Sequence, residues 1–293
     1  MSNSNNKNSF AVFGLLFGAC FWGVVWYPYR LMQAAGVSGV ASSFYSYVIA
    51  FMIASAIFAK HWRGLFAQPR SIIWLSLIAG WTNLAYVIAV IDGQVMRVIL
   101  LFYLSPLWTL ILARFWLKER TNAKGLAAIF FALLGAFIML YDAKSGSILP
   151  SSQSDWLALS SGIGFAMTNV ITRKSAHLTI VAKSFAVWLG VIVMSLIFMP
   201  FIGDAFPAPS FFTANHWQIM TLISLVLVLG TLLVQYGVTQ MTATAASVIF
   251  LFELVVAAIA SYYLAGEVMA LNEWMGGILI VAAAFAAATN NPS

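Results

Sequence analysis

Long apolar segments recur along the whole chain and limit what it can fold into. Ten segments each hold about 20 predominantly apolar residues, the length that an α-helix needs to cross the hydrocarbon core of a bilayer. The loops between them are short and leave no room for a soluble domain. The expected spans are residues 10–34, 41–60, 71–92, 95–117, 123–142, 155–175, 181–201, 216–238, 243–264 and 271–289.

The composition also indicates a polytopic membrane protein. Of the 293 residues, 62% are apolar and only 8% are charged, whereas a soluble domain has roughly 25% charged residues. The net charge of +6 does not indicate nucleic-acid binding, because the basic residues fall at the ends of the expected spans, where they set orientation. The single cysteine, Cys20, excludes an intrachain disulfide.

Lysine and arginine are distributed unequally between the two faces of the predicted membrane domain. Three of them, Arg30, Arg97 and Lys144, fall on one face, and the other eleven fall in the N-terminal tail and alternate loops. The positive-inside rule therefore predicts that both termini are cytoplasmic. The eleven are Lys7, Lys60, Arg63, Arg70, Arg114, Lys118, Arg120, Lys124, Arg173, Lys174 and Lys183.

The second half of the chain repeats the plan of the first. Aligning Glu267 with Glu119 gives a shift of 148 residues, which also pairs Phe250 with Phe102. The expected orientation places the Glu119 loop inside the cell and the Glu267 loop outside. The two halves would then be related by inversion across the membrane, which is frequent in carriers that work by alternating access.

A second alignment extends the repeat to the first and sixth spans, where Trp22 pairs with Phe165. We therefore predict an all-α polytopic membrane protein with ten transmembrane helices in two inverted five-helix repeats. The first repeat is expected to cover residues 1–145 and the second residues 146–293.

These features resemble the drug/metabolite transporter superfamily, specifically its EamA-type members. The second half departs from the pattern in having Leu254 where Pro106 stands in the first, so no proline assists a bend in the ninth span. The resemblance rests on the Leu104-Ser105-Pro106 bend, on Glu119 and Glu267 at the ends of the fourth and ninth spans, on Phe21-Trp22-Gly23, and on small-residue fifth and tenth spans.

Within the superfamily, the aromatic central spans, the Phe252-Glu253 pair and the short loops are most similar to bacterial exporters of amino acids, including aromatic ones. The resemblance implies a secondary transporter of the bacterial inner (plasma) membrane that moves small zwitterions outward by alternating access. The expected partners are a small-molecule substrate and the lipid bilayer. No cofactor, metal or nucleic acid is expected, and the protein should be a monomer or a weak homodimer.

Glu253 is the strongest candidate for a functional residue. It lies near the middle of an apolar span, where a carboxylate is costly unless it faces protein or water. It could couple transport to protons or bind a substrate ammonium. The alternative is a buried acid that only fixes helix packing. If Glu253 couples protons, Glu253→Gln should keep transport and abolish its pH dependence.

Polar and aromatic side chains of the central spans are the other candidates to line a cavity. Amides could bind the charged groups of an amino acid, and aromatic faces could stack on its side chain. Interhelical hydrogen bonds and lipid-facing aromatic belts are the alternatives. Pro106 is the candidate for gating, because proline bends a helix. Besides Glu253, the predicted substrate-binding residues are Trp22, Trp26, Asn83, Tyr86, Tyr103, Trp108, Asn169, Gln235 and Tyr236.

Two other classes of function remain as alternatives. Within transport, the cargo could be a drug or another metabolite. A nucleotide-linked sugar is disfavoured, because the spans lack the basic residues that a diphosphate needs. A membrane-embedded enzyme should show ionisable groups clustered at one depth, and only Glu253 lies deep, so we do not expect an enzyme. The three histidines are not spaced as ligands of a metal site.

Overall fold

Helices make up nearly all of the computed structural model, which describes residues 2–60, 69–92, 98, 101–119, 122–140, 150, 152–202, 207–265 and 271–289. No strand occurs within these ranges. The longer helices are α1 (Ser2–Ala34), α2 (Gly39–Ile57), α3 (Pro69–Asp92), α6 (Ala123–Leu140), α7 (Gln153–Lys174), α8 (Ile180–Ile202), α9 (Ala214–Gln240) and α12 (Leu271–Thr289).

Two of the expected spans consist of shorter pieces. The fourth holds α5 (Ser105–Leu112) and a π-helical turn, η2 (Ala113–Leu117), and its beginning lies outside the described residues. The ninth holds α10 (Ala243–Phe250) and α11 (Phe252–Ala265). Each of the other eight expected spans coincides with one helix, and their ends agree to within a few residues. The exception is the start of α1, which lies eight residues before the expected start at residue 10.

Six described helical stretches are long and apolar enough to cross a membrane. In α6 and α12 the apolar stretches are shorter, Ala123–Ile138 and Trp274–Ala283. The more polar α7 is not among the six, and it has Arg173 and Lys174 in its last turn. A multi-pass membrane protein follows, while the count of ten spans stays a prediction. The six stretches are Asn8–Ala34, Gly39–Ile57, Pro69–Val90, Ile180–Phe201, Ala214–Gln240 and Ala243–Leu264.

Capping side chains fix where several helices begin. Ser152 and Asp155 form a capping box at α7, in which Asp155 N donates to Ser152 Oγ at 3.1 Å and Ser152 N donates to Asp155 Oδ2 at 3.2 Å. Thr242 caps α10 by accepting a hydrogen bond from Ala245 N at 3.3 Å. Such side chains satisfy the backbone N–H groups that a helix start leaves without partners.

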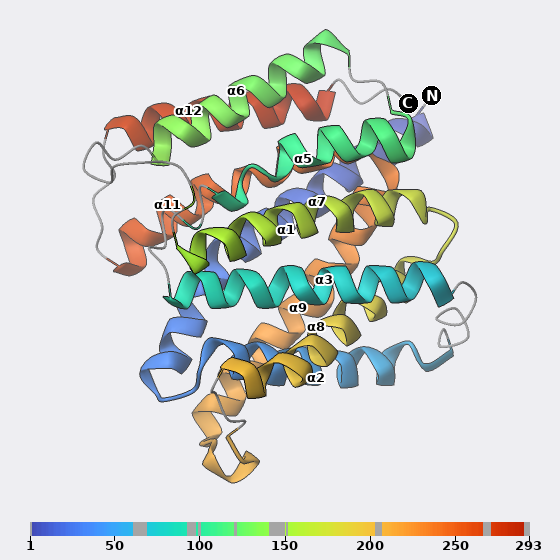
Figure 1. Ribbon diagram of the computed structural model, residues 1–293. Helices are drawn as coiled ribbons and strands as arrows, with labels where there is room; N and C mark the ends of the chain where they lie inside the picture. The colour runs from blue at the N-terminus through green and yellow to red at the C-terminus, as the bar shows by residue number, and fades with distance from the viewer. Residues whose placement is uncertain are drawn as a thin grey trace.

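Glycines allow the closest helix contacts. α6 and α12 lie side by side at one edge of the bundle (Figure 1), and a Cβ at Gly135 of α6 would be only 2.7 Å from Gly276 O of α12. Where α3 crosses α8, a Cβ at Gly190 would be 1.9 Å from Ser76 O. Small residues at such crossings let the backbones approach, which is how membrane helices commonly associate.

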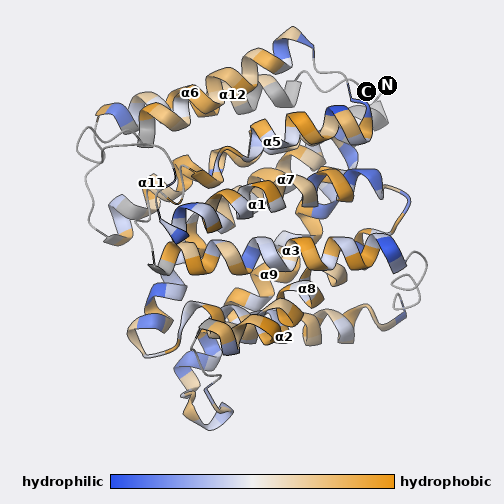
Figure 2. Ribbon diagram, in the orientation of Figure 1, coloured by the Kyte–Doolittle hydropathy of each residue, from blue (hydrophilic) through white to orange (hydrophobic). Residues whose placement is uncertain are grey.

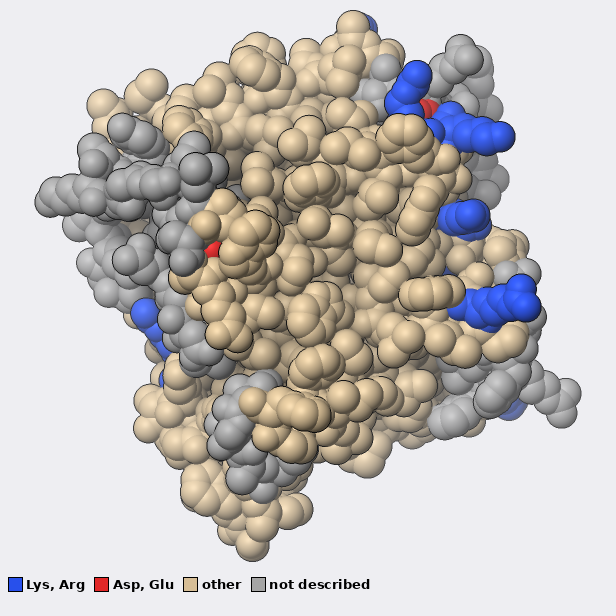
Figure 3. Space-filling model, in the orientation of Figure 1, with Lys and Arg blue, Asp and Glu red and all other residues tan. Residues whose placement is uncertain are grey.

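Charged residues gather at one end of the bundle. Apolar residues cover most of each helix, and hydrophilic residues lie mainly at the helix ends (Figure 2). Lysine and arginine are concentrated along one edge, at the right in Figure 3, where α7 ends and α10 begins. We call this edge the basic end. The chain also enters α1 and leaves α12 at this end (Figure 1).

Candidate functional site

Two expected spans are interrupted near their middle. The fourth breaks at Tyr103 and Leu104, directly before α5, and the ninth breaks at Leu251, between α10 and α11. Short-range hydrogen bonds mark both breaks, from Leu107 N to Leu104 O at 3.0 Å and from Leu254 N to Leu251 O at 3.1 Å. The 148-residue shift sets Leu251 on Tyr103, so the two breaks occupy equivalent positions in the two halves of the chain.

Proline accounts for the first break but not for the second. Pro106 is buried in the first turn of α5, where its missing N–H group is no loss. The ninth span has Leu254 at the equivalent position and is broken all the same. The absence of a second proline therefore does not keep the ninth span straight. The gating role predicted for Pro106 stays a prediction.

Glu253 lies at the second break, in the first turn of α11, and is partly buried. The hydroxyl of Tyr103, at the first break, donates a hydrogen bond to its carboxylate. Tyr86 on α3 is close enough to interact electrostatically with the same carboxylate. α1 also reaches this level, since a Cβ at Gly23 would be 2.9 Å from Glu253 O. The structure thus brings together Glu253, Tyr103 and Tyr86, three of the predicted residues.

A row of aromatic rings runs from Tyr86 across three further helical segments. Its ring centroids are 5.0 Å apart between Tyr86 and Phe102, 5.5 Å between Phe102 and Phe165, and 5.1 Å between Phe165 and Phe250. We call these four residues the aromatic row. Its three phenylalanines were not among the predicted site residues. The internal repeat could have indicated them, because it pairs Phe102 with Phe250 and Phe165 with Trp22.

Three other predicted residues present buried polar atoms to the interior. Trp108 Nε1 on α5, Asn169 Nδ2 on α7 and Gln235 Oε1 on α9 have no hydrogen-bond partner among the described residues. Most buried polar groups in proteins have such a partner, from protein or ordered water. These atoms are therefore available to a ligand or to water inside the bundle.

The remaining predicted residues make other contacts in the described part of the chain. Asn83 accepts a hydrogen bond from Ser43 Oγ at 2.7 Å, which links α3 to α2. Arg30 stacks over the Trp26 ring at 5.3 Å from its centroid. The other two pack on rings, Trp22 edge-on to Phe21 at 5.1 Å and Tyr236 edge-on to Phe10 at 5.2 Å.

A charged network joins the two halves of the chain at the basic end. Glu119, which follows η2, pairs with Arg173 of α7, with 3.6 Å between Oε1 and Nε, and accepts a hydrogen bond from Ala243 N of α10 at 3.2 Å. Arg173 donates to Thr239 O, and Lys183 of α8 donates to Thr239 Oγ1. The Lys183 side chain is fully buried. We call these five residues the basic-end network.

Burial and charge act in opposite directions on Glu119. Burial raises the pKa of Glu119 above the usual glutamate value, and the Arg173 guanidinium beside it lowers that pKa in part. Lys118, directly before it, has the positive φ of 55° that few residues other than glycine adopt. The corresponding acid of the second half, Glu267, lies outside the described residues.

The network continues inward along α7 and α9. Asn169 and Gln235 lie four residues before Arg173 and Thr239, and therefore on the same helix faces one turn deeper. No group of three or more histidine, cysteine, aspartate or glutamate residues that could hold a metal ion occurs within the described ranges.

Comparison with known proteins identifies the family. The sequence profile of the EamA-like transporter family matches residues 9–141 and again residues 153–289. A solved structure titled "Crystal structure of protein" has the same fold, with a TM-score of 0.76 and 15% sequence identity over 95% of this chain and 96% of the other. No curated protein matches the chain. The chain belongs to the EamA-like transporter family, and is thus a member of a family of membrane transporters.

Proposed function

We propose that this transporter exports amino acids, aromatic ones included, through a cavity at the level of the two helix breaks. The observation that carries the proposal is Glu253 at the second break, hydrogen-bonded to Tyr103 and close to Tyr86. Ionisable residues inside membrane spans mark substrate or ion pathways, because a charge there is too costly to keep without a role. Glu253 binds the ammonium group of the substrate.

The aromatic row receives the side chain of the substrate. Its rings run from Tyr86, beside Glu253, to Phe250, three residues before it in the chain. Offset and edge-on ring pairs are favourable, so an aromatic side chain fits among them better than a polar one. The unpartnered atoms of Trp108, Asn169 and Gln235 supply polar contacts on the side of the cavity nearer to the basic end.

Transport proceeds by alternating access. The positive-inside rule assigns the basic end to the cytoplasm. The basic-end network closes that side, since Glu119 of the first half is tied to Arg173 and to the start of α10 in the second half. Inward access requires these contacts to separate, and the breaks beside Pro106 and Leu251 supply the hinges.

Ligand-induced stabilisation tests the substrate class. A ligand that binds only the folded protein raises its melting temperature. We expect phenylalanine and phenylethylamine, which both carry an ammonium group, to raise the Tm of the purified protein, and 3-phenylpropionate to leave it unchanged. In Glu253→Gln the rise should be lost, whereas Gln218→Glu, an exposed change at the start of α9, should keep it. Stabilisation by 3-phenylpropionate alone, or by none of the three, would contradict the proposal.

A further inference from the structure

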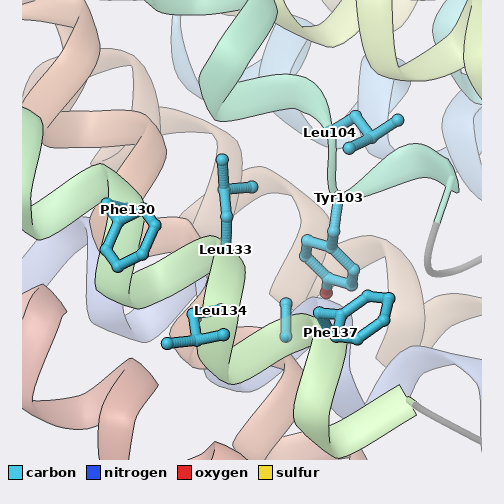
Figure 4. A pocket seen from close by; sticks show the side chains of 7 residues that line it. Tyr103, Leu104, Phe130, Leu133, Leu134 and Phe137 are labelled. Atoms are coloured by element: carbon cyan, nitrogen blue, oxygen red, sulfur yellow. The ribbon is translucent and has the colours of Figure 1, made fainter.

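An apolar pocket opens at the break in the fourth span. It has a volume of about 310 Å³ and lies between this break and α6 (Figure 4). The ring of Tyr103 forms its inner wall. The residues that line it are Tyr103 and Leu104 from the break and Phe130, Leu133, Leu134, Ala136 and Phe137 from α6.

The mouth of the pocket faces the surroundings of the bundle. Phe130 and Phe137 are 62% and 40% exposed, whereas Tyr103 is only 5% exposed. Both phenylalanines belong to the apolar stretch Ala123–Ile138 of α6. In a membrane protein, an exposed apolar helix surface inside the bilayer meets lipid hydrocarbon.

We propose that a hydrocarbon chain of a bilayer lipid occupies this pocket. Apolar cavities of this kind stay dry and bind apolar molecules, as an engineered cavity of about 150 Å³ binds benzene or xenon. A zwitterionic substrate does not fit, because Tyr103 supplies the only polar side-chain group in the lining, and its hydroxyl already donates to Glu253. A lipid chain loses no hydrogen bond on entering.

The lipid chain would pack against the ring of Tyr103, which lines the pocket and whose hydroxyl donates to Glu253. A bound chain therefore fills the gap that the helix break leaves beside α6 and seals Glu253 from the lipid side. This inference concerns the lipid face of Tyr103 and holds whatever the transported substrate is.

Photo-crosslinking in nanodiscs tests the site. The probe is a phosphatidylcholine with a diazirine in the middle of one acyl chain, and labelled residues are located by mass spectrometry. We expect labelling of residues 130–137 to saturate as the mole fraction of the probe rises. Labelling around Phe201, which is 81% exposed on α8, should rise in proportion to the probe. Proportional labelling at both places would overturn the proposal.

A filling variant gives the second test. Leu134→Trp places a larger side chain in the pocket and should reduce labelling of residues 130–137 to the proportional background. Leu126→Trp, at a 49% exposed position of α6 outside the pocket, should leave the saturating component intact. Saturating labelling that persists in folded Leu134→Trp would contradict the proposal. Should that variant not fold, the saturation curve of the unchanged protein decides alone.

Discussion

Tyr103 fixes the position of Glu253. Its hydroxyl donates to the carboxylate, and its ring is packed between the aromatic row and α6. A carboxylate away from water needs such partners, because an unpaired charge is very costly in an apolar environment. A substrate ammonium would supply the opposite charge that Tyr103 cannot.

Removing the hydroxyl oxygen of Tyr103 isolates the contribution of its hydrogen bond to Glu253. Tyr103→Phe keeps the ring and deletes the donor, so Glu253 loses the hydrogen bond that orients it. A hydrogen bond to a charged group contributes about 1.5–3 kcal/mol, so KM for phenylalanine should rise about tenfold or more. The measurement is initial uptake into proteoliposomes, with Tyr263→Phe, a 77% exposed position on α11, as the control. An unchanged KM would show that the hydroxyl plays no part in binding.

For single residues, the sequence indicates which side chains carry functional groups more readily than it indicates whether a side chain faces lipid or the interior of the bundle. Glu253 and Tyr86 are predicted from their polar groups in apolar spans and Tyr103 from its aromatic ring, and the binding role of all three stays a prediction. Phe102 and Phe250 are not predicted as site residues, since an apolar ring is equally stable against lipid and inside a helix bundle. Asn83 shows the converse, because its interhelical bond to Ser43 is the alternative that the sequence had left open.

At the scale of helices, the α3–α8 crossing is the closest approach at any glycine for which the structure describes such a contact. A methyl group at Gly190 would lie 1.9 Å from Ser76 O, far inside van der Waals contact. The two backbones cannot keep their separation with any side chain there.

Two glycine substitutions should therefore differ sharply. Gly190→Ala forces α3 and α8 apart and should destabilise the protein by about 1–3 kcal/mol, the usual cost of overpacking. Gly277→Ala on α12 should be tolerated, because its Cβ would meet Val255 Cγ2 at 3.8 Å. Thermal unfolding in detergent measures both, and equal melting temperatures for the two variants would refute the tight crossing.

The positions of most helices were predictable, and the breaks only in part. The apolar pattern predicts residues 243–264 as one span, because hydropathy does not detect a change in backbone direction. Pro106 indicated a bend in the fourth span. Nothing at Leu251 or Leu254 did so in the ninth, where the break comes from the backbone arrangement and not from a residue that excludes helix.

At the scale of the whole molecule, a part-buried ion pair between described residues joins the two halves at the basic end. The side chains of Glu119 and Arg173 are 17% and 32% exposed. For such a pair, losing one partner is harmful when it leaves a charge both buried and unpaired. The two partners are not equivalent in this respect, because Arg173 also donates to Thr239 O and is the more exposed.

Variants of the two partners should thus have unequal effects on the proposed closure of the basic end. Arg173→Gln leaves Glu119 buried without its counter-charge and should open the basic end. Glu119→Gln should leave it closed. The reporter is Thr244→Cys in a Cys20→Ser background, at a 6% exposed position on α10. We expect thiol labelling from the basic end to rise about tenfold in Arg173→Gln, the effect of about 1.4 kcal/mol. Equal rates in both variants would contradict the asymmetry.

The pH dependence of the proposed closure follows from Glu119. Its pKa is raised by burial in the closed arrangement, which therefore holds the proton more tightly than an arrangement with Glu119 in water. Closure is favoured below the ordinary glutamate pKa and weakens as pH rises through the raised pKa. Arg173 faces Glu119 directly, and Lys183 lies behind Arg173. The measurement is the labelling rate of Thr244→Cys with Glu119 present, divided by the rate of the same reporter in a Glu119→Gln background at the same pH. This ratio should rise with pH. A ratio that falls with pH would refute the predicted direction.

The all-α architecture and its two repeats could be predicted because membrane helices leave strong signals. Apolar length and the 148-residue repeat each depend on many residues, so no single exception removes them. The orientation inferred from lysine and arginine stays a prediction. The pairing of Glu119 with Arg173 could not be predicted from these signals, since it depends on how four helix ends meet in space. The division at residues 145 and 146 and the loop of Glu267 lie outside the described residues.

Flux of labelled amino acids into proteoliposomes tests the proposed function most directly. Purified protein is reconstituted and presented with phenylalanine, tryptophan, leucine and threonine, with and without a pH gradient. We predict saturable flux of phenylalanine and tryptophan that empty liposomes lack and that Glu253→Gln weakens. Protein that binds none of the four and moves none of them, while remaining folded, would contradict amino-acid transport.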